Sequence, residues 1–211
     1  MQLTTRAIVL AVRAHGEHGA IVRALTPGEG VQPGYVRGGR SRRLKPILVP
    51  GNEVQADYRA RTEDQLAHLS VELVHSRAFL FSEPLAAAGL EWACALTAAA
   101  LPEGQPYPHV HEGLDGLLAA IEAAPSARGW SVALIRYELV VLAELGFGLG
   151  PERLATLPRT LTAGGTSDWA AIHTGLGVTG NLLARDLLTD RRGEVLAARE
   201  RLVERLKRVG G

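Results

Sequence analysis

Cysteine is almost absent from this chain of 211 residues, which contains only Cys94. A single cysteine excludes an intrachain disulfide and any zinc site built from several thiolates. Long apolar runs are absent too, because no stretch reaches the ~18 residues that a membrane span requires. The first 16 residues alternate in character, and Arg13 interrupts them before the apolar core of a signal peptide can form. These absences predict a soluble cytoplasmic protein with no membrane partner.

The usual enzyme motifs are scarce as well. The sequence contains no phosphate-binding P-loop, no HExxH zinc motif and no GxSxG elbow. The run His109-Val110-His111-Glu112 is similar to a metal-ligand cluster, but no third partner stands at a usual spacing. Cys94 lies in an apolar segment, which is typical of a packing thiol rather than of a nucleophile. We therefore expect no enzymatic activity, no cofactor and no metal site.

Positive and negative side chains nearly balance, with 23 Lys and Arg against 22 Asp and Glu, a net charge of +1. Taken alone, that balance argues against DNA binding driven by electrostatics. The two parts of the chain differ, however. Residues 1–81 have 11 basic and 7 acidic side chains, whereas residues 82–211 have 12 and 15. The first part is therefore positive and the second negative, which predicts two surfaces with different partners.

Residues 1–81 consist of short β-branched or alternating segments separated by turns rich in glycine and proline. Five such segments predict strands at residues 6–13, 20–26, 31–37, 54–61 and 66–76. Short strands joined by turns favour a small closed barrel, because closure hides the strand edges. Among five-stranded barrels, the OB-fold is the design that we predict, and it binds oligonucleotides.

From residue 82 onward the apolar spacing changes from two to about 3.6 residues. Ser82 is predicted to cap a first helix that has Pro84 in its first turn. Helices are predicted at residues 85–101, 109–124, 130–145, 169–176 and 182–188. The segment 130–145 is apolar on nearly every side, which places it at the centre of a bundle. A last helix opens at Gly193, with these side chains facing inward: Val195, Leu202, Leu206 and Val209.

The predicted fold class is therefore α+β. A five-stranded OB-fold β-barrel, residues 1–81, precedes an all-helical domain, residues 82–211.

The segment between residues 37 and 45 contains five cations in nine residues, and no acidic residue lies between Glu29 and Glu53. We call this segment the basic loop. Such a loop on an OB-fold favours nucleic-acid binding through phosphate contacts, although a solvated loop has the same composition. Arg59 and Arg61 alternate on the predicted fourth strand and extend the patch. The predicted nucleic-acid contacts are Arg37, Arg40, Arg42, Arg43, Lys45, Arg59 and Arg61.

Two tyrosines flank this loop in the sequence, and each has two open interpretations. Tyr35 and Tyr58 are either rings on which bases stack or packing residues of the barrel.

Several segments together resemble the RecO family, and its alphaproteobacterial branch in particular. The opening resemblance lies in residues 8–17, 20–22 and 25–26, and it continues in residues 36–44 with Pro50-Gly51-Asn52. Further matching segments are Val71-Glu72-Leu73-Val74, Pro84-Leu85, Ala93-Cys94-Ala95-Leu96, Arg136-Tyr137-Glu138-Leu139 and residues 142–149.

The resemblance implies an N-terminal OB-fold, a helical C-terminal domain and binding of both single- and double-stranded DNA. It implies a DNA repair and recombination mediator of the RecF pathway, associated with the nucleoid, that anneals complementary strands. The implied partners are RecR, which it helps to load the recombinase, and the acidic C-terminal tail of single-stranded DNA-binding protein. Many relatives carry a four-cysteine zinc module, which the single Cys94 of this chain cannot form.

The acidic helical part suits protein partners better than DNA. We predict that cations on its helices meet the carboxylates of the acidic tail: Arg136, Arg185, Arg199 and Arg205. The alternative function is a protein-interaction scaffold with only weak DNA contact. Basic-loop arginines that are all paired with acids of the helical part would favour that alternative.

Overall fold

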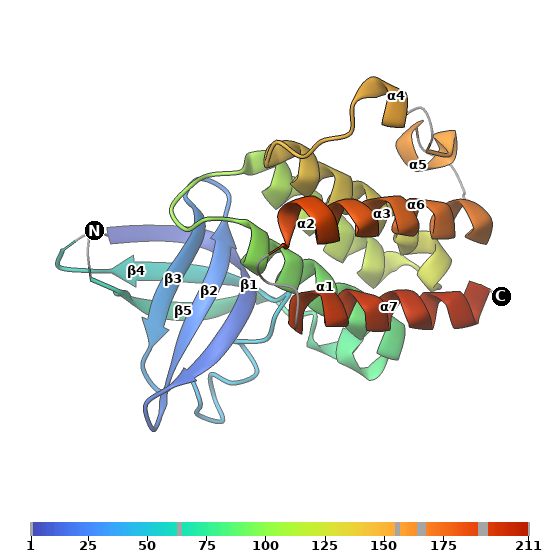
Figure 1. Cartoon of the computed structure of the whole chain (residues 1–211). Coiled ribbons are helices and arrows are strands. Elements are labelled where there is room, and N and C mark those ends of the chain that lie inside the picture. Colours follow the sequence, from blue (N-terminus) through green and yellow to red (C-terminus); the bar gives the residue numbers. More distant parts are fainter. Residues whose placement is uncertain (1, 63–64, 155–156, 164–167, 190–193, 211) are drawn as a thin grey trace.

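A closed five-stranded barrel forms the first part of the computed structural model, which describes residues 2–62, 65–154, 157–163, 168–189 and 194–210 (Figure 1). The strands follow one another around the barrel in the order β1-β2-β3-β5-β4. All pairs are antiparallel except the short parallel contact of β3 with β5. The strands are β1 (Gln2–His15), β2 (Gly19–Thr26), β3 (Gly30–Val36), β4 (Glu53–Arg59) and β5 (Ala67–His75). The predicted OB-fold is confirmed.

The strands bury side chains on both faces near the helical part. One set points into the barrel, including Val9, Val22 and Tyr58. A second set points outward and joins the core of the helical part: Ile8, Leu10, Leu25 and Val31. The pairing of β1 with β2 shifts between Val9 and Ala11, so that neighbouring Val9 and Leu10 can both be buried.

Helices form the second part, in which α3 lies at the centre and packs against α1, α2, α5 and α6. The predicted position of this helix is confirmed. The helices are α1 (Pro84–Ala100), α2 (Pro108–Ala123), α3 (Ala127–Glu144), α4 (Pro151–Leu154), α5 (Arg159–Ala163), α6 (Trp169–Leu182) and α7 (Glu194–Gly210). A 3₁₀ turn, η1 (Ala78–Ser82), precedes α1, and a π-helical turn, η2 (Leu183–Leu187), follows α6. Figure 1 shows α7 running beside α1.

Several details of the helices differ from the prediction. One helix, α6, is continuous where the first of two short helices, 169–176, was predicted to end, and the short helices α4 and α5 were not predicted. Ser82 does not cap α1, because it lies in η1, where its hydroxyl donates to the carbonyl of Phe79 at 2.7 Å. The first helix begins at Pro84 after Glu83, whose side chain makes no capping bond. In α7, Leu202 and Leu206 are buried as expected, but Val209 is 55% exposed because it lies in the last turn. Gly193 lies outside the described residues.

The loop between α1 and α2 reaches back onto the barrel. The backbone N–H of Gly104 donates to the carbonyl of Val31 at 3.0 Å, and Val31 and Glu103 form an isolated β-bridge. Together with the shared core, this contact joins the two parts, and the domain division after residue 81 stays a prediction. In the described part of the chain, no helix combines the length and apolar character of a membrane span.

Candidate nucleic-acid interface

Strands β1, β2 and β3 carry partly exposed side chains on the outside of the barrel. Cross-strand pairing sets Arg13, Ile21 and Tyr35 side by side on β1, β2 and β3. The next row toward the helices consists of Ala11, Arg23 and Pro33. On β2, Val22 lies between Ile21 and Arg23 and belongs to the barrel core, so Ile21 and Arg23, with their cross-strand neighbours, lie on the outside of the barrel. We call these two rows the outer face.

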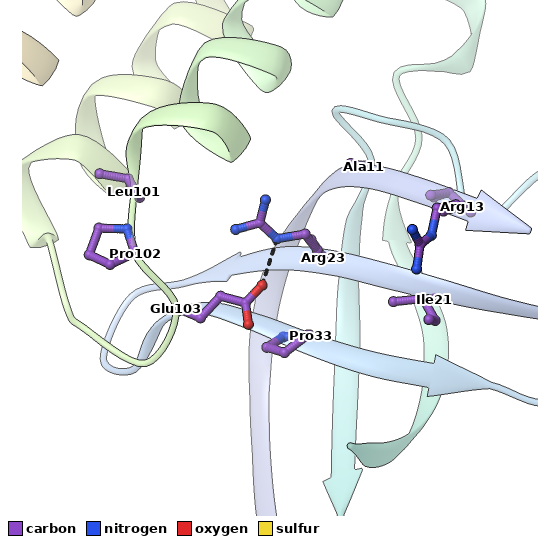
Figure 2. Close-up of a pocket in the computed structure, with 9 residues that line it drawn as sticks. Ala11, Arg13, Ile21, Arg23, Pro33, Leu101, Pro102 and Glu103 are labelled. Atoms are coloured by element: carbon purple, nitrogen blue, oxygen red, sulfur yellow. Dashed lines mark ion pairs between the residues drawn. The ribbon is translucent and has the colours of Figure 1, made fainter. Parts of the chain in front are cut away.

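One groove lies between the outer face and the loop that joins α1 to α2, with a volume of about 670 Å³ (Figure 2). Arg23 points toward this loop, and its Nε lies 2.9 Å from Oε1 of Glu103. Its Nη1 also donates to the carbonyl of Ala98, near the end of α1, at 2.6 Å. Figure 2 shows Arg13 on the neighbouring strand, and no ion pair engages it among the described residues. The charge of Arg23 is therefore already compensated, whereas that of Arg13 is available.

A second groove of about 690 Å³ lies at the other end of the outer face, and we call it the tyrosine groove. Its walls come from the β1–β2 turn at residues 15–19 and from the start of the basic loop, with Tyr35 between them. Two histidine rings stand edge-on to the Tyr35 ring: His15 at 5.8 Å and His68 at 6.4 Å between ring centroids. Arg37 lines the same groove. An aromatic ring and a cation therefore share one concave surface.

The basic loop presents its cations to solvent. Arg37, Arg40, Arg42, Arg43 and Lys45 are all exposed. Among the residues that the structure describes, no acidic side chain forms an ion pair with any of the five. This stretch of unpaired positive charge can neutralise phosphates.

The basic loop is nevertheless anchored. Leu44 of the loop packs against the barrel core, and Leu48, three residues after the loop, is buried in that core. Arg40 donates from its backbone N–H to His18 O at 3.2 Å and from Nη1 to Glu17 O at 3.0 Å. These bonds hold the loop against the β1–β2 turn, beside the tyrosine groove.

The other predicted DNA contacts, Arg59 and Arg61, lie outside the basic loop and do not share one face of a strand. Strand β4 ends at Arg59, so Arg61 lies in the bend that follows and does not alternate with Arg59 on the strand. Arg59 is paired with Asp57, its Nη2 lying 2.6 Å from Oδ2. Tyr58 is fully buried, and its hydroxyl donates to the carbonyl of Gln32 at 3.4 Å. Tyr58 is thus a packing residue, whereas Tyr35 lies in a groove.

The four arginines predicted to meet a protein partner do not form one patch. Arg199 is buried and bonded to Glu138, which removes it from any docking surface. Arg136 donates from Nε to the carbonyl of Leu161 at 2.7 Å. Arg185 is exposed and pairs with its neighbour Asp186.

Arg205 of the same set is also exposed, and it donates to the carbonyl of Pro84 at 2.9 Å. Only Arg185 and Arg205 of the four therefore present guanidinium groups at the surface.

Two further candidates for chemistry are His109 and Cys94. His109 lies 2.8 Å from Glu144, which raises the pKa of this histidine through a hydrogen bond. No group of three or more metal-ligating side chains gathers among the described residues. Cys94 is buried. The spacing of Gly175, Gly177 and Gly180 matches a GxGxxG fingerprint, but all three lie inside α6 and follow no strand.

Sequence reasoning missed Arg13 and Arg23 as members of the same surface as Tyr35. Each lies on a strand that was predicted, and period-two alternation assigns each to one face of its own strand. Which residues become neighbours across strands depends on the register, and the bulge after Val9 shifts that register.

An OB-fold barrel with a cationic loop, followed by a helical bundle, defines the class of two-part fold to which this chain belongs. Comparison with known families narrows this class. Residues 1–77 match the family model "Recombination protein O N terminal", and residues 82–153 match "Recombination protein O C terminal". The chain belongs to the RecO family.

Curated relatives support the same assignment. The chain is 35% identical to "DNA repair protein RecO" of Rhodospirillum centenum, over 99% of this chain and 96% of that protein. It is 41% identical to the protein of the same name from Phenylobacterium zucineum, over 85% of this chain and 71% of the relative. The RecO protein of Gluconacetobacter diazotrophicus is 35% identical over 97% of this chain.

Proposed function

We propose that this protein is a DNA repair and recombination mediator that binds single- and double-stranded DNA and brings complementary strands together. Its membership of the RecO family, whose curated relatives are named as DNA repair proteins, supports a role in DNA repair. The observation that carries the proposal is the anchored basic loop, with five exposed cations and no ion pair to a described acid.

The proposed mechanism is physical rather than catalytic. The cations of the loop, together with Arg13 and Arg61, neutralise phosphates and release condensed counterions. Neutralisation lowers the repulsion between two strands, so complementary strands can approach and pair. Phosphate contacts carry no sequence information, which suits a protein that must act at any damaged site.

The helical part is proposed to serve protein partners, with RecR and the tail of single-stranded DNA-binding protein as those implied by the family. Its net negative charge disfavours DNA. Exposed Arg185 and Arg205 are the cations of the predicted set that can reach an acidic peptide. Through these contacts the protein would help RecR to load the recombinase on coated DNA.

The test of the DNA-binding proposal is a triple change of Arg40, Arg42 and Arg43 to Ala. We expect weaker binding to both DNA forms, because three phosphate contacts are lost. The slope of log K against log salt is negative, and its magnitude should decrease by about 2 for single strands and by about 3 for duplexes. Fluorescence anisotropy over a salt series measures both quantities.

The matched control changes three exposed cations of α7, Arg201, Lys207 and Arg208, to Ala. It alters the net charge equally but lies away from the barrel, so the salt slope should stay unchanged. Equal effects of the two triple variants would mean that net charge alone, and not the loop, drives binding.

The partner proposal has a separate test. A synthetic acidic tail peptide should bind the full chain in calorimetry, and a double change of Arg185 and Arg205 to Ala should weaken it. The alternative function, an interaction scaffold with weak DNA contact, predicts peptide binding together with an unaltered DNA affinity of the basic-loop variant.

A further inference from the structure

The Tyr35 ring has an unusual position for a tyrosine of a small barrel. The two buried tyrosines, Tyr58 and Tyr137, each have a hydrogen-bond partner for their hydroxyl. Among the described residues the Tyr35 hydroxyl has none, and its ring lines a groove instead of the core. The ring therefore lies on the outside of the barrel, where one part of it borders a groove.

The chain accommodates the ring at a specific place. A Cβ at residue 19 would lie 2.4 Å from the Tyr35 ring, so only glycine there lets the ring cross β2. The edge-on rings of His15 and His68 limit its rotation from two other strands. The ring is thus oriented before any ligand arrives, which lowers the entropic cost of binding.

The tyrosine groove offers a ring, a cation and exposed backbone, and Glu17 and His18 of the β1–β2 turn line it too. Arg37 lines the same groove and offers a guanidinium to a phosphate. Gly16 and Gly38 border open space, so a ligand can approach the backbone closely. Ile21 lies beside Tyr35 in the outer row and extends the apolar surface. Base faces within a duplex are covered by their neighbours, so only an unpaired base can lie on the ring.

Building on the proposed function, we infer that the tyrosine groove is a binding site for an unpaired nucleobase, which stacks on Tyr35 while its phosphate meets Arg37. The groove makes the barrel sensitive to strandedness. The basic loop binds phosphates of either DNA form, and Tyr35 adds affinity only where bases are unpaired.

The experiment compares the wild-type full chain with Tyr35→Leu and Tyr35→Phe, using a thymidine oligonucleotide, a matched duplex and an abasic oligonucleotide of equal length. Stacking on one base corresponds to roughly a 5- to 140-fold change in affinity. Tyr35→Leu should lose that factor on the thymidine strand and stay within twofold on the duplex. Tyr35→Phe keeps the ring and should bind like the wild type. The wild type should prefer thymidine to the abasic strand, and Tyr35→Leu should not.

Equal losses on single strand and duplex would overturn the inference, because Tyr35 would then only support the surface. Unchanged binding by Tyr35→Leu would overturn it too. The abasic comparison with wild-type protein needs no variant, so a misfolded variant cannot hide the answer. If the basic-loop variant weakens binding and Tyr35→Leu does not, the base site fails and the proposed function stands. If the basic-loop variant has no effect, the proposed function itself fails.

Discussion

One buried ion pair lies among four helices of the bundle. Glu138 on α3 is fully buried, and Arg199 on α7 reaches both of its oxygens at 2.8 and 2.9 Å. Trp92 Nε1 donates to the same carboxylate at 2.8 Å, and Thr179 donates to it as well. Every polar group of this cluster has a partner, which is the condition under which a buried charge is tolerated. The cluster ties α7 to α1, α3 and α6.

We predict that Arg199→Ala lowers the free energy of unfolding by about 3–5 kcal/mol, because Glu138 then stays buried without its cation. Urea unfolding measures the change. Arg208→Ala on the same helix is the matched control, since its pair with Glu204, at 4.0 Å, is exposed. That control should cost about 0.3–0.5 kcal/mol. A similar cost for both variants would show that the buried network does not hold α7.

Cys94 is another buried group with a measurable consequence. Burial raises the pKa of its thiol from 9.0 to about 12. The proton is held more tightly in the folded state, so stability from this group is present below about pH 9 and is lost as pH rises toward 12. At pH 8 we expect no reaction with a thiol reagent until urea unfolds the chain. Rapid labelling of the folded protein would contradict the burial of this thiol.

At the scale of elements, the loop between α1 and α2 makes a close backbone contact with the barrel. It lies against the end of the turn between β2 and β3, where the first residue of β3, Gly30, has a φ of +67°. A Cβ at this position would lie 1.8 Å from the carbonyl oxygen of Gln105. The turn and the loop can meet only if residue 30 lacks a side chain.

We predict that Gly30→Ala destabilises the protein by more than about 1 kcal/mol, since alanine is strained at positive φ and also meets backbone. Gly28→Ala in the same turn is the control, because no atom lies within 4 Å of a Cβ there. The control should stay within about 0.5 kcal/mol of the wild type. Thermal unfolding of both variants provides the comparison, and equal midpoints would refute the steric argument.

The elements themselves were largely predictable. Period-two alternation located all five strands, and the change of period at residue 82 located the start of the helical part. Strand β1 is longer than predicted, Gln2–His15 instead of residues 6–13, because its first residues pair with β4. The cap at Ser82 was wrong because a 3₁₀ turn intervenes. Local sequence does not reveal the pairing of β1 with β4.

At the scale of the whole molecule, Arg77 joins the barrel to the bundle. Its side chain is 5% exposed, and Nη1 donates to the carbonyl of Gly51 at 2.9 Å. The same guanidinium approaches Asp115 at 3.3 Å and Glu122 at 3.4 Å, both on α2. Its backbone N–H donates to the buried Asn52 side chain at 2.8 Å. Arg77 thus contacts polar groups of both the barrel and the helical bundle.

We predict that Arg77→Ala costs about 3 kcal/mol, because the buried carbonyl of Gly51 loses its donor and Asp115 and Glu122 lose the nearby cation. For a chain of this size, that loss corresponds to roughly 6–12 °C in Tm. Arg6→Ala is the matched control in the barrel, since its 3.2 Å pair with Glu53 is exposed and should matter little. If calorimetry gives both variants the wild-type Tm, Arg77 does not stabilise the junction.

The sequence by itself determined the two-part architecture, the position of the basic loop and the uneven distribution of charge, because period and composition are local properties. Tertiary structure decided which cations are exposed at the surface and which are buried in ion pairs. Arg199 and Arg42 look alike in the sequence, yet one is buried beside Glu138 and the other is exposed. Tertiary structure also placed Tyr58 in the core and Tyr35 in a groove with Arg37, since register and long-range packing determine which distant residues become neighbours.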